Sequence, residues 1–258
     1  MKPWPLLPLA AAGGVQCHGG IFNYTIDGVD YAGQFPWLPE DGQSTIQRRW
    51  WGDPIRDVDH PYLACNRGIP LAAHTPTLHA PIRAGGTITA KFHHPDCPPD
   101  LGFWFHTHGP MVVYLADCGG PCAAFRPAAG DRVWFKVWET GLLPGFSVVD
   151  RDGWDQFPYA NAGWNVSLPR RLRPGNYLVR HEIIYIENDP AQFYPYCAQL
   201  AVEGDGDEVP GDEFKVAFPG AYSAADPGIA VAGIFYAPGA DQPMNYTIPG
   251  PPIWKGGD

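Results

Sequence analysis

The sequence predicts an all-β domain, either a sandwich or a barrel, from three observations. Apolar and polar residues alternate in several short stretches, which is the pattern of strands with one buried face. Clusters of glycine and proline separate these stretches, and helical periodicity is scarce. Although the chain has 31 glycines and 30 prolines, 45% of its residues are hydrophobic and ten are tryptophan, so it can bury a core.

Five stretches are expected to be strands, and the one that begins at Tyr177 is the clearest. It follows a turn made by residues 169–176. Two long irregular segments, 36–61 and 150–163, are expected to be surface loops. The residues of the clearest strand that share one face are Tyr177, Val179, His181, Ile183, Tyr185 and Glu187. The expected strands are 87–93, 103–114, 132–138, 177–187 and 198–202.

The charge balance excludes several classes of partner. Lys and Arg number 17 and Asp and Glu number 27, which gives a formal net charge of −10. A field of that sign repels phosphate backbones and anionic membranes, so neither nucleic acid nor a membrane is expected as a partner. Neutral substrates remain compatible with it. Neither a repeat nor a linker divides the chain, and we expect one domain, residues 18–258, that acts as a monomer.

The N-terminus has the features of a secretory signal peptide that ends at Cys17. A basic start is followed by a short apolar stretch, residues 4–12, and then by small residues. A buried N-terminal strand is the alternative, but the prolines of this segment argue against it. We therefore expect residues 1–17 to be removed and the protein to be extracellular. Glycosylation sequons, which fit this destination, begin at Asn23, Asn165 and Asn245.

The cysteines favour structural disulfides. If Cys17 leaves with the signal peptide, five of the six cysteines remain, enough for two disulfides and one spare thiol. Cys118 and Cys122 are separated by Gly-Gly-Pro, one residue more than in a redox C-x-x-C motif. In an exported chain this spacing indicates a tight turn closed by a disulfide.

Removal of residues 1–17 would make His18 the first residue of the mature chain, with consequences for metal binding. Its α-amine and its ring Nδ1 could then chelate one metal ion, and a second imidazole opposite would complete three nitrogens that suit Cu(II) better than tetrahedral zinc. His108 is the natural second ligand, and His106, which has the same parity on an extended chain, competes with it. The phenol oxygen of Tyr194 could occupy an axial position.

Short motifs that run in order along nearly the whole chain identify a family. Each motif is brief, but together and in this order they are highly specific. The motifs are His18-Gly19, Cys65-Asn66-Arg67-Gly68, His108-Gly109-Pro110, Tyr114-Leu115-Ala116, Glu139-Thr140-Gly141-Leu142, Pro174-Gly175-Asn176-Tyr177, Arg180-His181-Glu182-Ile183-Ile184, Gln192-Phe193-Tyr194-Pro195-Tyr196-Cys197, Asp226-Pro227-Gly228-Ile229 and Tyr246-Thr247-Ile248-Pro249-Gly250-Pro251. The chain resembles the fungal lytic polysaccharide monooxygenases of auxiliary activity family nine, formerly glycoside hydrolase family sixty-one.

The resemblance implies a fold, a cofactor and a set of site residues. The fold is an immunoglobulin-like (fibronectin type III-like) antiparallel β-sandwich with long loops and a flat face that carries one copper ion. The copper ligands would be His18, His108 and Tyr194, and the Gln192 amide would hydrogen-bond oxygen species. His181 is expected to be structural. The implied disulfides are Cys65–Cys197 and Cys118–Cys122, which leaves Cys97 spare, and the aromatic residues expected to stack on sugar are Tyr236 and Trp37.

The chain departs from the family pattern at Glu187. Members usually carry a histidine three residues after the paired isoleucines of this strand, and Glu187 stands at that position here. A carboxylate in place of an imidazole could move protons only if its pKa were raised, whereas an ionised one would only accept hydrogen bonds. The sequence leaves both protonation states open.

The leading functional prediction is a secreted copper monooxygenase that oxidises C1 or C4, or both, of a β-1,4-glucan such as cellulose or a related hemicellulose. It would use O₂ or H₂O₂ and an external electron donor, either a small reductant or a redox enzyme. One alternative is a copper-binding or glycan-binding relative with weak or no oxidation, because of Glu187. The other is a structural wall protein, which would follow if Cys17 were retained and His18 had no free amine.

Overall fold

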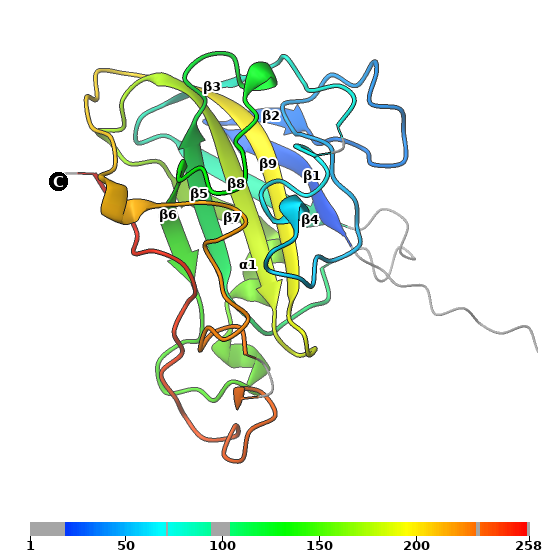
Figure 1. The fold of residues 1–258 in the computed structure, drawn as a ribbon, viewed down its shortest axis with the longest axis vertical. Helices are drawn as coiled ribbons and strands as arrows, with labels where there is room; N and C mark the ends of the chain where they lie inside the picture. The colour runs from blue at the N-terminus through cyan, green and yellow to red at the C-terminus, as the bar shows by residue number, and fades with distance from the viewer. Residues whose placement is uncertain (1–18, 71, 94–103, 231–232, 257–258) are drawn as a thin grey trace, which may run out of the picture.

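The computed structural model is a sandwich of two β-sheets, and it describes residues 19–70, 72–93, 104–230 and 233–256 (Figure 1). The smaller sheet consists, in spatial order, of β2 (Val29–Ala32), β1 (Gly20–Ile26), β4 (Thr87–His93) and β7 (Trp164–Ser167). The larger sheet consists of β10 (Lys215–Val216), β6 (Trp134–Thr140), β5 (Met111–Asp117), β8 (Gly175–Tyr185), β9 (Gln192–Glu203) and β3 (Ala80–Arg83).

Short helices lie in the connections between the strands. The α-helix is α1 (Gln156–Ala162), and the 3₁₀ turns are η1 (Pro61–Leu63), η3 (Cys122–Ala124), η4 (Arg151–Gly153) and η5 (Asp212–Phe214). None of the helices in the described ranges is long and apolar enough to cross a membrane.

The longest strands, β8 and β9, form an antiparallel hairpin that organises the larger sheet. Their register runs from Gly175 opposite Val202 to Tyr185 opposite Gln192. The other pairings in both sheets are antiparallel, except that β3 runs parallel to β9. The turn of the hairpin therefore follows Tyr185 and precedes Gln192, at the lower end of the sheet in Figure 1.

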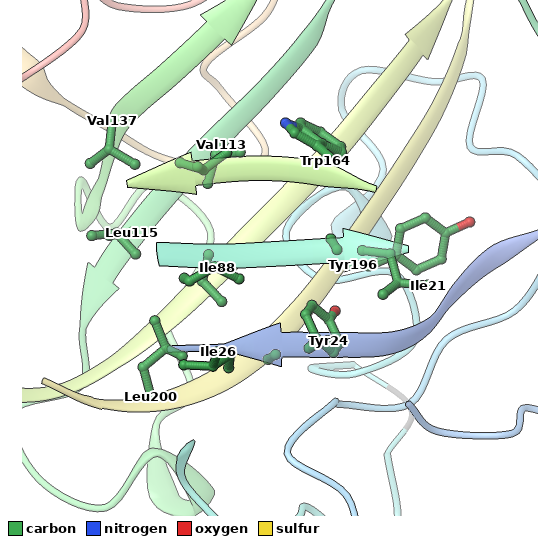
Figure 2. Packing of buried hydrophobic residues seen from close by; sticks show 14 of the residues in the cluster. Ile21, Tyr24, Ile26, Ile88, Val113, Leu115, Val137, Trp164, Tyr196 and Leu200 are labelled. Carbon is green, nitrogen blue, oxygen red and sulfur yellow. The ribbon is translucent and has the colours of Figure 1, made fainter. Parts of the chain in front are cut away.

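The main core fills the space between the two sheets (Figure 2). Figure 2 shows β1, β4 and β7 crossing the larger sheet with apolar side chains between the layers. On β8, alternate residues such as Val179 and Ile183 point into this core, as strand geometry requires.

The opposite face of the larger sheet is buried as well, beneath long connecting segments. Leu178 and Ile184 of β8 belong to a second apolar cluster together with Phe218, Tyr222 and Ile229 from the C-terminal connections. Because both of its faces are covered, β8 is buried along most of its length, from Tyr177 onward.

A buried ion pair ties the end of η1 to the strand β8. The Arg180 guanidinium donates to both carboxylate oxygens of Glu182 at 2.7 and 2.8 Å and to the carbonyl of Leu63 at 2.7 Å. Tyr222 donates to the same carboxylate at 2.6 Å. All these partners are buried, so each charge is compensated by short hydrogen bonds rather than by water.

The predicted all-β sandwich is confirmed, while the boundaries of its strands are confirmed only in part. β4 coincides with the predicted stretch 87–93, and β6 and β8 each lie two residues from the predicted start. The predicted strand 103–114 is confirmed only from Met111 to Tyr114, and its start is wrong, because strand pairing begins after Gly109 and Pro110. The alternation in that stretch comes from buried side chains in an irregular segment.

The two predicted surface loops are more structured than expected. Residues 150–163 contain α1, whose Gln156 and Ala160 are buried one helical turn apart. In residues 36–61, Gln47 and Ile55 form isolated bridges with β9, and residues 45–48 are buried. These corrections arise because the loops cover a sheet face that is itself apolar.

Both disulfides implied by the family resemblance are present. Cys65 is bonded to Cys197 of β9, with 5.3 Å between their Cα atoms, and Cys118 is bonded to Cys122. No cysteine in the described ranges is free. Cys97 and the proposed signal peptide, residues 1–17, lie outside the described residues.

The Cys65–Cys197 bridge closes a loop of 132 residues, so its loss should be costly. In the chain-entropy model a loop of this size contributes about 4–5 kcal/mol to the free energy of unfolding. We expect the Cys65→Ser/Cys197→Ser double variant to lose about that amount in chemical denaturation. The Cys118→Ser/Cys122→Ser variant is the matched control, and it should lose less. Equal losses in the two variants would contradict the loop-length argument.

His181 should make stability depend on pH. Its ring packs against Trp164 at 5.0 Å, it has no hydrogen-bond partner within the described residues, and burial lowers its pKa to about 3. The unfolded chain binds a proton below about pH 6.5, while the folded chain stays neutral to about pH 3, so stability falls as the pH is lowered through that window.

We expect His181→Leu to remove this pH dependence. As the pH is lowered from 6 to 4, the wild type loses stability and the variant does not. The free energy of unfolding of the variant minus that of the wild type should therefore increase by up to about 1.4 kcal/mol for each pH unit. Denaturant melts at several pH values measure this difference. A difference that stays constant with pH would show that the ring is not held neutral.

Candidate functional site

A buried polar cluster lies at the end of the β8–β9 hairpin and is centred on Tyr194. The Tyr194 hydroxyl lies 2.6 Å from the side-chain amide of Gln192 and 2.9 Å from Nε2 of His106. Burial raises the pKa of Tyr194 far above its ordinary value, so the phenol is neutral. The side chains of Gln192, Tyr194 and His106, all named in the sequence analysis, therefore meet at the Tyr194 hydroxyl.

The Gln192 amide is oriented by groups outside the hairpin strands. Its oxygen accepts from Arg56 at 2.9 and 3.0 Å and from Asn188 at 2.6 Å, which directs its nitrogen to donate to the Tyr194 hydroxyl. The Tyr194 proton is then directed toward His106 Nε2, and that nitrogen accepts it with its lone pair. Sequence reasoning did not find Arg56, because it comes from the distant segment 36–61.

The His106 ring is held by aromatic packing. It stacks on Tyr185 with 3.8 Å between ring centroids and meets the Trp104 ring edge-on at 5.0 Å. The residue is only 4% exposed. Tyr185 ends β8, so the strand pairing itself supplies one wall of the position that His106 occupies.

The segment that carries both histidines is fixed to the end of β8. The backbone NH of Ile186 donates to the carbonyl of His108 at 3.1 Å, and Ile184 donates to Pro110 at 3.0 Å. From α1, the Gln156 amide donates to the carbonyls of Gly109 and Ile184, each at 3.1 Å. A Cβ at Gly109 would lie 1.9 Å from the Ile184 carbonyl oxygen, so only glycine permits this approach.

His108 lies on a different side of the cluster from Tyr194. Its Nδ1 contacts a carboxylate oxygen of Glu187 and lies 2.7 Å from the Thr107 hydroxyl. Its Nε2 lies 3.2 Å from the carbonyl of Val149, and its ring meets Phe235 edge-on at 5.3 Å. Among the described residues, each His108 ring nitrogen therefore faces an oxygen.

Glu187 accepts hydrogen bonds from several groups and is held as a carboxylate. Burial alone raises its pKa, but hydrogen bonds from His108 and Tyr185 outweigh burial and leave the pKa below its usual value. Of the two protonation states that the sequence left open, the contacts favour the ionised one. Its backbone carbonyl also accepts a hydrogen bond from Tyr236.

The first described residue, Gly19, is hydrogen-bonded to Tyr196 of β9. Its carbonyl accepts a hydrogen bond of 2.7 Å from Tyr196, two residues after Tyr194 on the same face of the strand. Tyr196 also meets Trp50 edge-on at 5.2 Å. His18, the predicted N-terminal ligand, lies outside the described residues.

The two predicted sugar-stacking residues are both exposed. Tyr236 is 60% exposed, and its neighbour Phe235 touches His108, so this pair borders the cluster. Trp37 is 45% exposed and packs 6.1 Å from Phe22, near the start of β1. Stacking on sugar remains a prediction for both residues.

The sequon asparagines differ in exposure. Asn165 and Asn245 are exposed, whereas Asn23 is half-buried within β1. Glycosylation at the three positions stays a prediction.

A metal site made only of the described residues is not evident. No group of three His, Cys, Asp or Glu side chains in residues 19–256, within the described ranges, could hold an ion. Among the described residues, the imidazole of His106 and the phenol of Tyr194 meet at 2.9 Å, and both are donors of kinds that copper accepts.

Comparison with known proteins gives a consistent result. The family model described as Auxiliary Activity family 9 (formerly GH61) matches residues 18–242. The chain is 38% identical to lytic polysaccharide monooxygenase B of Heterobasidion irregulare, over 97% of this chain and 99% of that protein. It is 36% identical to the monooxygenase-like protein CEL1 of Agaricus bisporus, over 94% of this chain and 72% of that protein.

Solved structures share the fold. The crystal structure of HiLPMO9B matches with a TM-score of 0.79 and 37% identity, covering 93% of this chain and all of that one. A cellulose-active polysaccharide monooxygenase from M. thermophila matches with a TM-score of 0.78 and 33% identity, again over 93% of this chain and all of that one. The chain therefore belongs to Auxiliary Activity family 9, the family of the lytic polysaccharide monooxygenases.

Proposed function

We propose that this chain is a secreted, copper-dependent monooxygenase that cleaves β-1,4-glucan, with cellulose as the first substrate to test. One observation carries the proposal: Gln192, Tyr194 and His106 meet in one buried cluster, on the segment that also carries His108, in a chain of this family. The match to a cellulose-active structure supports the substrate class. The net charge of −10 is compatible with a neutral glucan.

The residues present fit one copper ion. His18 would supply its amine and its ring nitrogen, His108 would supply a second imidazole, and Tyr194 would supply a phenol oxygen. Nitrogen and oxygen donors of these kinds would suit Cu(II). When bound, copper would supply the one-electron redox chemistry that an external reductant and O₂ or H₂O₂ need to hydroxylate C1 or C4 of the sugar.

The surrounding side chains orient the donors rather than react themselves. Arg56 and Asn188 fix the Gln192 amide, so its nitrogen points at Tyr194 and at the space beside it. The high pKa of Tyr194 keeps the phenol protonated, which makes it a weak donor. Glu187 holds His108 and Tyr185 at the edge of the cluster. Exposed Tyr236 and Trp37 would stack on sugar rings.

Export is part of the proposal. The family match begins at residue 18, immediately after the proposed signal peptide of residues 1–17. The two disulfides are of the kind that persists in oxidising compartments. Export and processing would also create the free amine of His18.

Product analysis on cellulose tests the proposal directly. The processed protein, loaded with copper and supplied with ascorbate, is incubated with amorphous cellulose, and the soluble products are identified by mass spectrometry. We expect oligosaccharides oxidised at C1, at C4 or at both. Copper-free protein is the control. A copper-loaded, correctly processed protein that releases no oxidised product from any β-1,4-glucan would overturn the proposal.

Correct processing should decide copper affinity. One extra residue before His18 removes the free α-amine from the position of a ligand, so Cu(II) affinity should fall by at least about 100-fold, or more than about 2.8 kcal/mol. Isothermal titration of native and extended proteins measures the change. The melting temperature of the copper-free proteins should be the same. Equal copper affinities would rule out a role for the amine.

Tyr236 should contribute to adsorption on cellulose through its ring. Loss of one stacked aromatic costs about 0.5–1.5 kcal/mol, so Tyr236→Ala should weaken adsorption by about 2- to 10-fold. Tyr236→Phe keeps the ring and removes only the hydrogen bond to the Glu187 carbonyl, so it should adsorb like the wild type. Equal weakening in both variants would assign the effect to that hydrogen bond instead.

A further inference from the structure

We propose that Glu187 is a positioning residue for the copper ligand His108: its carboxylate accepts the Nδ1–H of the ring, which leaves Nε2 to bind the metal. The inference rests on the proposed function and adds one residue to it. The family resemblance implies a histidine at position 187, so it does not itself supply this role. Three features of the contact support the inference.

The first feature is the direct contact between the carboxylate and the ring. A carboxylate oxygen of Glu187 contacts His108 Nδ1, and the two side chains are only 29% and 8% exposed. The Thr107 hydroxyl lies 2.7 Å from the same nitrogen, but a hydroxyl can donate or accept, so it does not decide where the ring proton lies. A carboxylate only accepts, and it therefore directs the proton to Nδ1.

The second feature is the surroundings of the other ring nitrogen. Nε2 of His108 lies 3.2 Å from the carbonyl oxygen of Val149, an exposed residue in the turn before η4. A carbonyl has no proton to donate, so it does not occupy a lone pair on Nε2. When the proton lies on Nδ1, a neutral ring carries its lone pair on Nε2, where copper would replace the contact with Val149.

The third feature is that Glu187 is itself held in place. The Tyr185 hydroxyl donates to its second carboxylate oxygen, and the Tyr236 hydroxyl donates to its backbone carbonyl. The preceding residue, Ile186, donates its backbone NH to the carbonyl of His108 at 3.1 Å. Separate backbone and side-chain bonds thus join the two segments, and a partner fixed in this way can hold the ring in one orientation.

The contact would affect the metal in two ways. It would fix the tautomer and the direction of the ligand ring, and it would raise the basicity of Nε2, because the charge of Glu187 stabilises positive charge on the ring. A nearby carboxylate also attracts doubly charged Cu(II) more strongly than Cu(I). Glu187 would therefore act on the metal site through His108.

A variant that removes the charge and keeps the shape tests the inference. In the correctly processed protein, Glu187→Gln should lower Cu(II) affinity by about tenfold or more, as for residues that orient a metal ligand, and Cu(I) affinity by less. Each tenfold fall in the ratio of Cu(II) to Cu(I) affinity should raise the reduction potential by about 59 mV.

Asp189→Asn is the matched control for the loss of one negative charge. Asp189 is exposed and lies two residues further along the chain. Because solvent and salt screen an exposed charge, both affinities of this variant should stay within about twofold of the wild type. An equal effect in the two variants would overturn the inference, since it would show that net charge, not the contact with His108, is responsible.

A measurement on the wild type covers the case in which Glu187→Gln does not fold, as judged from the melting temperature of the copper-free protein. Two-dimensional ¹H–¹⁵N spectra of the histidine rings in the Cu(I)-loaded wild type locate each ring proton. We expect the His108 proton on Nδ1, shifted downfield and slow to exchange, because it is bonded to the carboxylate. A proton on Nε2, or an Nδ1 proton that exchanges freely with water, would overturn the inference.

The proposed function fails separately from the role of Glu187. If the wild type itself binds no Cu(II) tightly, the copper proposal is wrong, whatever Glu187 does. If the wild type binds copper and Glu187→Gln matches it in both affinities and in reduction potential, the copper proposal stands and the role of Glu187 is wrong. Lower turnover of that variant on cellulose with unchanged affinities would also overturn the inference, because Glu187 would then act on the oxidant and not through His108.

Discussion

The antiparallel pairing of β8 with β9 is the constraint on which the rest of the structure depends. The paired register runs from Gly175–Val202 to Tyr185–Gln192 and places Tyr194 and Tyr196 on the face toward the smaller sheet. Because side chains alternate along a strand, a slip of one residue would turn both tyrosines to the opposite face. The same pairing brings the end of β8 beside the start of β9, where the cluster forms.

The opposite face of this hairpin anchors the long connections. Arg180 holds the Leu63 carbonyl and Glu182, and Cys197 is bonded to Cys65, so the segment before residue 68 is attached to β8 and β9 by two different bonds. Removing one member of the buried ion pair would leave the other charge uncompensated, which is why such pairs resist substitution. Arg56 belongs to the same segment and donates hydrogen bonds to the Gln192 amide oxygen. The bonds that anchor this segment therefore also help to orient Gln192.

The charges at the site are arranged so that an ionised carboxylate stands among neutral aromatic groups. Glu187 is stabilised by His108 and Tyr185, and its pKa is lowered despite partial burial. The family resemblance implies a histidine at this position, and here an imidazole contacts the Glu187 carboxylate from another segment, at His108. The carboxylate and the histidine thus form a pair, which a reading of position 187 alone does not show.

Sequence alone determined the all-β class and the family, because alternation and short ordered motifs are local properties of the chain. It also predicted Gln192 and Tyr194 as site residues, and the structure brings these two side chains into contact. The disulfide pairs followed from the family resemblance rather than from any spacing. The alternation pattern predicted the wrong structure at residues 104–110 and missed α1. In both places side chains are buried beneath other segments, without strand pairing and without a long amphipathic repeat. His106 and His108 have the same parity, so alternation alone does not separate them, and only the His-Gly-Pro motif marked His108. The tertiary structure decided their surroundings, because Tyr185 and Trp104 pack on the His106 ring while Glu187 and Val149 contact His108, and Tyr185, Glu187 and Val149 come from distant parts of the chain.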